Sequence, residues 1–245
     1  MILFLIAVLP PLFITYYIYR LDKYEKEPQR LIVKSFLLGC FIVVPVIFLE
    51  LFAQHFFNVD ISDNFNQMGS ASSGIFDVDF GLFFYVLIGI ALIEEGFKYL
   101  VLRKYLYGNP EFNEPFDGIV YAVTISMGFA LVENLGYVYG EEGGGGFSVG
   151  IMRMFSAIPA HGLFGVIMGY YAGKAKFTPG SEKTLLLKGL GGAILLHCLY
   201  DYFLFLGTIA GVAFAFISLF VAIGFCKKAI KEHQDASPFK PGQDE

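Results

Sequence analysis

Seven ionisable side chains lie inside long apolar stretches of this sequence: Glu94, Glu95, Lys98, Glu133, His161, His197 and Asp201. An ionisable side chain at the centre of a membrane costs about 3 kcal/mol on insertion scales, so such residues usually face partners or a polar cavity. Buried carboxylates can move protons, and histidines combined with carboxylates can bind a metal. The set therefore indicates one shared polar interior with acid–base or metal chemistry.

Spacing along a helix indicates which of these groups can meet. Lys98 lies four residues after Glu94 and three after Glu95, so it can pair with either carboxylate. The two adjacent glutamates point about 100° apart, which predicts that one faces the site while the other pairs with Lys98. His197 and Asp201 are four apart and share a helix face, as metal ligands or a histidine–carboxylate pair must. No HExxH motif is present.

Simpler interpretations exist for the same residues. Polar groups inside a membrane also serve as helix–helix hydrogen bonds that fix packing. His161 is followed by the small residues Gly162 and Gly165, so its ring could simply bond a neighbouring carbonyl. Asp117 comes two residues after Pro115, and a role at the start of a helix is the favoured interpretation for it.

The elements that must position these side chains are membrane spans. The chain has 245 residues, is 56% hydrophobic and is only 16% charged, with a mean hydropathy of +0.62, whereas a soluble domain is roughly 25% charged. Each span needs about 20 apolar residues. We predict an all-α, polytopic transmembrane bundle with seven spans, at about 2 to 19, 31 to 56, 80 to 102, 116 to 139, 151 to 173, 185 to 206 and 208 to 226.

Three further predictions concern the limits of this bundle. The first span lacks a basic segment before it and is interpreted as a retained helix, not a cleaved signal. Only Gly207 and Thr208 separate the last two spans, so these could form a tight hairpin or have a shifted boundary. We expect a single catalytic membrane domain over residues 1–230 and a polar, disordered cytoplasmic tail over 231–245. Three cysteines lie inside apolar segments and are expected to be packing residues.

Lysine and arginine occur in alternate connections. They are concentrated after the first, third and fifth spans and at the C-terminal end, while the connection over residues 58–79 is acidic and the one over 140–150 is glycine-rich. The positive-inside rule then predicts that the N-terminus is outside and the C-terminus cytoplasmic. The sequence has no basic patch that would indicate nucleic acid as a partner.

Three motifs on successive spans resemble the PrsW family of intramembrane proteases, which is related to the type II CAAX prenyl endopeptidases. An EExxK motif runs from Glu94 to Lys98, an FxxxE motif from Phe129 to Glu133, and an HxxxD motif from His197 to Asp201. The similarity covers about residues 10–225. The wider group typically has histidine at the position of Glu133 and asparagine at that of Asp201, so this site is more acidic and more attractive to a cation.

The resemblance implies hydrolysis of a peptide bond in or beside a transmembrane segment, in a bacterial cell membrane. It assigns the general base to Glu94, with Glu95 orienting it or pairing with Lys98. Catalytic roles would also fall to Glu133 and His197. A divalent metal, with zinc favoured, would be bound by Glu133, His197 and Asp201 with His161 as a further ligand, while a metal-free glutamic mechanism remains open. The substrate would be a single-span membrane protein, and the family suggests an anti-sigma factor in envelope stress signalling.

Two other classes of function fit some of the same residues. A proton- or cation-coupled transporter also uses buried Glu, His and Asp side chains as relays, although the spans show no obvious inverted repeat. A non-catalytic membrane scaffold that binds processed peptides would keep its function after Glu94→Gln. Peptide hydrolysis that depends on Glu94 distinguishes the protease from both.

Overall fold

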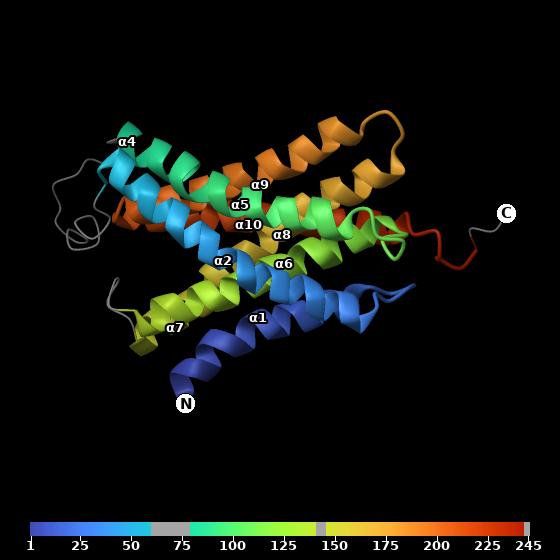
Figure 1. Cartoon of the computed structure of the whole chain (residues 1–245), viewed down its shortest axis with the longest axis horizontal. Helices are drawn as coiled ribbons and strands as arrows, with labels where there is room; N and C mark the ends of the chain where they lie inside the picture. The colour runs from blue at the N-terminus through green and yellow to red at the C-terminus, as the bar shows by residue number, and fades with distance from the viewer. Residues whose placement is uncertain (60–78, 141–145, 243–245) are drawn as a thin grey trace.

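A computed structural model describes residues 1–59, 79–140 and 146–242 of the chain, and the described residues are helical without any strand. Among them, seven helical segments are long and apolar enough to cross a membrane, which confirms the predicted bundle. Figure 1 shows them as one elongated bundle. The elements are α1 (Ile2–Leu21), α2 (Gln29–Phe57), α4 (Phe80–Phe84), η1 (Tyr85–Ala91), α5 (Leu92–Val101), η2 (Leu102–Leu106), α6 (Pro115–Tyr139), α7 (Gly146–Phe155), α8 (Ala157–Phe177), α9 (Glu182–Phe205) and α10 (Ile209–Asp235).

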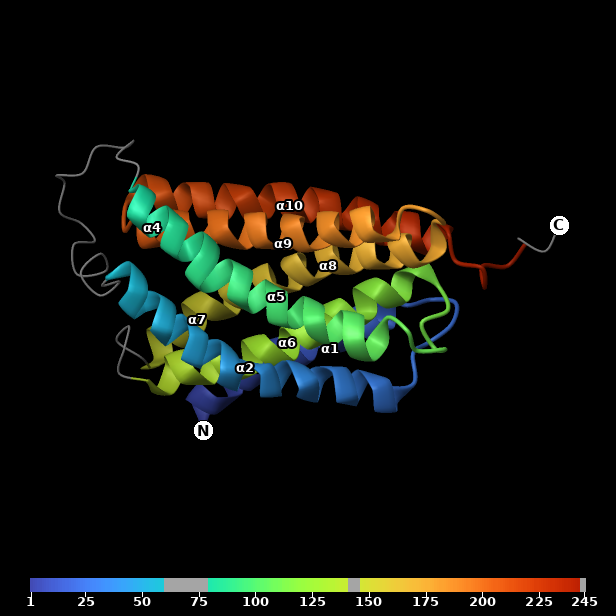
Figure 2. The ribbon, with the colours of Figure 1, turned by 45° about the horizontal axis from the view of Figure 1, so that its top comes forward.

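Helix α6 forms the centre of the bundle. In its most apolar window 89% of the residues are buried, against 22% to 50% in the other six spans. Helices α1, α2 and α8 pack against α6 and cover it, as Figure 2 shows. The outer helices instead expose large apolar side chains, for example Phe41 and Phe48 of α2 and Phe220 of α10. These surfaces suit a lipid environment.

Glycines let the backbones around α6 approach closely. A Cβ atom added at Gly118 of α6 would collide with the backbone of Gly169 and Gly173 in α8. On the other side of α6, a Cβ atom at Gly128 would collide with the carbonyl of Phe36 in α2. Small residues at helix contacts are a usual means of packing in membranes, because lipid tails offer no hydrophobic drive for association. The glycines therefore set the positions of α2 and α8 relative to α6.

Two spans are less regular than predicted. The third span contains two π-helical segments, η1 and η2, on either side of α5, and it ends at Leu106 instead of residue 102. The fifth starts at Gly146 instead of 151, ends at Phe177, and is broken at Ser156, whose φ of −124° and ψ of −78° are not helical. Hydrophobic length alone predicts neither feature, because both depend on contacts with other helices.

The last two spans are separate helices. Helix α9 ends at Phe205, Gly207 has a φ of 63°, and the hydroxyl of Thr208 accepts a hydrogen bond from the Gly211 N–H at 3.0 Å, which starts α10. Helix α10 continues to Asp235, so it includes the first residues of the tail expected from 231. Most of the acidic connection over 58–79, and 141–145 of the glycine-rich one, lie outside the described residues.

Candidate active site

Helix α5 carries the EExxK residues into the interior of the bundle. Glu94, Glu95 and Lys98 expose 3%, 0% and 1% of their surface, respectively. The helix is only ten residues long and lies between η1 and η2. Each extra residue in a π-turn rotates the following side chains around the helix axis, and such turns are frequent at functional sites. The charged side of α5 consequently faces the other helices instead of lipid.

The Lys98 ammonium joins three of the predicted site residues. Its Nζ atom donates to Glu94 Oε2 at 3.0 Å and to Glu95 Oε1 at 2.7 Å, and it lies 3.1 Å from His161 Nδ1. The aromatic ring of Phe129 lies 4.1 Å from the same nitrogen. Spacing predicts that one glutamate faces the site and the other pairs with Lys98; the structure differs, because the long lysine side chain reaches both preceding carboxylates at once.

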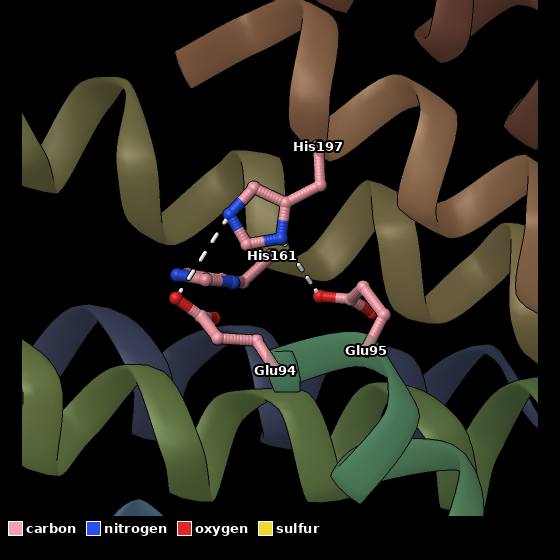
Figure 3. A group of neighbouring side chains, drawn as sticks. All are labelled: Glu94, Glu95, His161 and His197. Atoms are coloured by element: carbon pink, nitrogen blue, oxygen red, sulfur yellow. Dashed lines mark hydrogen bonds and ion pairs between the residues drawn. The ribbon is translucent and has the colours of Figure 1, made fainter. Parts of the chain in front are cut away.

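His197 of α9 connects both glutamates with Asp201. Its Nδ1 atom lies 3.1 Å from Glu95 Oε1, and its Nε2 atom lies 3.0 Å from Asp201 Oδ2 and 4.0 Å from Glu94 Oε1. The ring stacks on Phe164 with centroids 4.7 Å apart. Figure 3 shows the imidazole of His197 above the two carboxylates, with His161 beside it. The predicted His197–Asp201 pair is confirmed.

Glu133 lies on the other side of His161. Its Oε2 atom is 2.9 Å from His161 Nε2 and accepts a hydrogen bond from the Arg153 guanidinium at 2.7 Å. Arg153 also donates to the Asn134 side chain at 3.0 Å. The simple interpretation of His161, a bond to a backbone carbonyl, does not hold: its two ring nitrogens face Lys98 and Glu133.

Two residues near the site were not predicted from the sequence. Arg153 belongs to α7, where the break at Ser156 lets it approach Glu133, and its charge at the edge of an apolar span was the available signal. Glu50 of α2 lies against Glu94, and its Oε1 atom is buried without a hydrogen-bond partner. A glutamate within the apolar run of 31–56 was a signal of the same kind.

The donor atoms suit a divalent metal. Glu94, Glu95, His161 and His197 are all buried, and each offers one ligand atom within 4.8 Å of the others. Glu95 Oε2 is buried without a hydrogen-bond partner. Imidazoles and carboxylates are the nitrogen and oxygen ligands of catalytic zinc. This donor group differs from the predicted ligand set, since Glu133 and Asp201 lie at its edges, each against one histidine.

Comparison with known proteins identifies relatives over most of the chain. The family model for "PrsW family intramembrane metalloprotease" matches residues 27–225. Protease PrsW of Clostridioides difficile (strain 630) is 34% identical over 204 residues, which cover 82% of this chain and 79% of the relative. Protease PrsW of Bacillus subtilis (strain 168) is 31% identical over 199 residues, or 81% of this chain and 80% of the relative. No solved structure matches the chain significantly.

These similarities bear on the choice between the classes of function. The relatives are bacterial proteins named as proteases, and the matched region includes all seven ionisable residues of the predicted site. The transporter alternative is therefore not favoured. Seven apolar helices and bacterial relatives together identify a multi-pass protein of the bacterial cell membrane.

Proposed function

The chain belongs to the PrsW family of intramembrane metalloproteases, and from that premise we propose that Glu94 is the general base that activates the attacking water. The family membership makes the protein an endopeptidase that acts on membrane protein substrates within the bilayer. The observation that supports Glu94 most directly is the 4.0 Å separation between its Oε1 atom and His197 Nε2. That separation is too long for a direct hydrogen bond but suits a water molecule placed between the two groups.

Peptide hydrolysis at this position follows from ordinary acid–base steps. Glu94 removes a proton from the water, and the oxygen attacks the carbonyl carbon of the substrate. In the metal-free route, the Nε2–H of His197, which faces Asp201 before the substrate binds, turns to the oxyanion that forms and stabilises it. Glu94 then delivers the proton to the leaving nitrogen as the C–N bond breaks. Glu95 and Asp201 act as positioning residues, since their carboxylates lie 3.1 and 3.0 Å from the two nitrogens of His197.

We propose that zinc is the metal, held by His161, His197 and Glu95, whose Oε2 atom has no hydrogen-bond partner, which leaves Glu94 to act as the base. A bound zinc would supply Lewis acidity and a bound water with a pKa near 7. Glu133 and Asp201 would then orient the two imidazoles, because each lies about 3 Å from the Nε2 atom of one histidine. The Lys98 ammonium would remain beside the site and balance the charge of the two glutamates.

The substrate is proposed to be a single-span membrane protein, namely an anti-sigma factor in envelope stress signalling. The support for this is the resemblance of the three motifs to the PrsW family. A site buried between helices is suited to a substrate segment that enters from the bilayer. The surroundings of such a site exclude water, which strengthens the interactions of the reacting groups.

Cleavage of single-span test proteins by the purified protein in liposomes tests the proposed base. We expect wild type to make a defined cut near a membrane boundary, read by mass spectrometry, and Glu94→Gln to lose at least about 10²-fold in rate, as for loss of a general base. Glu182→Gln is the matched control, since Glu182 is half exposed and pairs with Arg103 away from the site. Equal cleavage by wild type and Glu94→Gln would refute the assignment.

Metal content tests the zinc proposal separately from activity. We expect about one zinc per chain in the purified wild type by mass spectrometry, as for a single catalytic site, and a clear loss of zinc in His197→Ala. His55→Ala should retain the wild-type content, because His55 lies exposed near the end of α2. Wild type without zinc that still cleaves in the presence of a chelator would support the metal-free glutamic mechanism instead.

A further inference from the structure

A second group of buried carboxylates lies at one end of the bundle. Asp22, Glu27, Glu114 and Asp117, called here the end cluster, expose no more than 1% of their surface. They come from the connection after α1 and from the start of α6, and Ser237, just after α10, is fully buried beside them. Figures 1 and 2 both show these three segments together at the end opposite the N-terminus. Asp117 precedes Glu133 by 16 positions on α6, roughly 24 Å at about 1.5 Å per residue.

In three carboxylates of the end cluster, one oxygen receives a hydrogen bond. Asp22 Oδ2 accepts from the Glu27 N–H at 3.3 Å, and Asp117 Oδ2 accepts from the N–H groups of Asn113 and Glu114 at 2.7 and 2.8 Å. The Tyr121 hydroxyl donates to Glu27 Oε2. These bonds hold the side chains in fixed orientations.

The other oxygens of the end cluster are buried and receive no hydrogen bond from an N–H group; the side chains of Asp22 and Glu114 and those of Glu27 and Asp117 instead lie against each other, and Ser237 lies against Glu114. These oxygens are Asp22 Oδ1, Glu27 Oε1, Glu114 Oε2 and Asp117 Oδ1, and the side-chain oxygen of the neighbouring Asn113 likewise receives no such bond. An unsatisfied buried polar group is costly, and a charged one more so. Five such oxygen atoms in one place point to a ligand that supplies positive charge.

No lysine or arginine forms a direct ion pair with the end cluster within the described part of the chain, although the charge of Lys176 acts on Asp117 and Glu27 from a distance. The two nearby lysines give their hydrogen bonds to backbone carbonyls: Lys26 to those of Tyr19 and Asp22, and Lys176 to those of Tyr107 and Asn109. Burial raises the pKa of Asp22 to about 8, with further contributions from two neighbouring carboxylates, and burial also raises the pKa of Glu27 to about 7. The bare cluster therefore resists being fully charged.

We propose that the end cluster binds a hard divalent cation, Ca²⁺ or Mg²⁺, which ties the connection after α1, the start of α6 and the segment after α10 together. Such cations take carboxylate and amide oxygens, and the cluster offers oxygens without histidine or cysteine. One oxygen each from Asp22, Glu114 and Asp117 lies within 4.8 Å of the others. Opposite ligands of Ca²⁺ at 2.3–2.6 Å lie about 5 Å apart, so the oxygens could surround one ion.

Cation binding by the full chain in detergent tests this proposal. The protein is first stripped with a chelator, and CaCl₂ or MgCl₂ is then titrated while heat of binding and thermal unfolding are measured. We expect saturable binding and a rise of several degrees in the unfolding temperature, as mass action requires for a ligand of the folded state. Comparing the two salts decides which ion is preferred.

Variants separate this site from the active site. Asp22→Asn and Glu27→Gln keep the side-chain shape and should weaken binding about tenfold or more, because affinity depends on the charge of the ligands. Glu94→Gln and the surface variant Glu182→Gln should retain wild-type binding. Two variants of the cluster are used so that a folding defect in one leaves the test intact.

Two results would overturn the proposal. The first is a wild-type protein that shows no saturable effect of either cation. The second is an effect that persists undiminished in Asp22→Asn and Glu27→Gln. If those variants also stabilise the cation-free protein and no cation binds to wild type, the carboxyl groups are held together by shared protons.

Discussion

At the scale of single residues, the site is a network of opposite charges around Lys98. The ammonium lies within 3.1 Å of two carboxylates and one imidazole, and all four groups are buried. Buried charges are tolerated only when they are paired and hydrogen-bonded. The same pairing keeps two glutamates, which would otherwise repel each other, side by side at the proposed position of the attacking water.

Replacing Lys98 with methionine should destabilise the protein. The change keeps the side-chain volume but leaves Glu94 and Glu95 without their shared partner, and breaking a buried pair in this way costs about 3–5 kcal/mol. The measurement is the free energy of unfolding in mixed micelles. As control, Lys174→Met removes the exposed ion pair with Glu232, whose side chains are 41% and 43% exposed, and exposed pairs contribute about 1 kcal/mol or less. Equal losses for the two variants would contradict the prediction.

At the scale of helices, breaks and close contacts bring the site together. The break at Ser156 separates α7 from α8, which lets Arg153 and His161 approach Glu133 from two directions. The π-segments η1 and η2 border the short helix that carries Glu94 and Glu95. Helix α8 reaches α6 closely only because Gly118, Gly169 and Gly173 lack side chains at their contact.

A side chain at Gly118 should therefore disturb both stability and cleavage. In Gly118→Val the new atoms would meet the backbone of α8, and overpacking of this kind costs typically 1–3 kcal/mol. We expect a lower unfolding temperature and slower cleavage, since α8 carries His161. Gly136→Val on the same helix is the control, because a Cβ atom there has nothing within 4 Å. An unchanged Gly118→Val would show that α8 can shift without loss.

At the scale of the whole molecule, an odd number of spans places the two ends of the chain on opposite sides of the membrane. The N-terminus and the C-terminal end of α10 lie at opposite ends of the bundle in Figure 1. The distribution of lysine and arginine predicts which end is cytoplasmic, and it puts the end cluster on the cytoplasmic side. The proposed cation site would then face the cell interior.

Cysteine labelling in spheroplasts tests this orientation. Lys183→Cys lies in the first turn of α9, and Phe147→Cys lies at the opposite end of the bundle, at the start of α7. A membrane-impermeant maleimide should label Phe147→Cys in intact spheroplasts and Lys183→Cys only after permeabilisation. The wild-type chain is the background control, because Cys198 and Cys226 are buried and Cys40 is partly so. The reverse pattern would invert the predicted topology.

The sequence by itself determined the class of the protein and most of the site. Span number follows from apolar length, because the bilayer requires about 20 apolar residues per helix. Pairings within one helix follow equally well: Lys98 with the glutamates and His197 with Asp201 are set by the geometry of 3.6 residues per turn. Asp117 acts at the start of α6 as expected, accepting two backbone N–H groups.

Only the tertiary structure decided which helices meet and at what register. Lys98 with His161, His161 with Glu133 and Arg153 with Glu133 join residues of different helices. The approach of Asp22 to Glu114 and Asp117 likewise joins parts far apart in the sequence. Such contacts depend on glycine packing, the π-segments and the break at Ser156. The side-chain periodicity of one segment carries no information about which residues of another segment lie next to it. Local geometry is encoded within a helix, whereas the relative placement of helices results from the packing of all of them together.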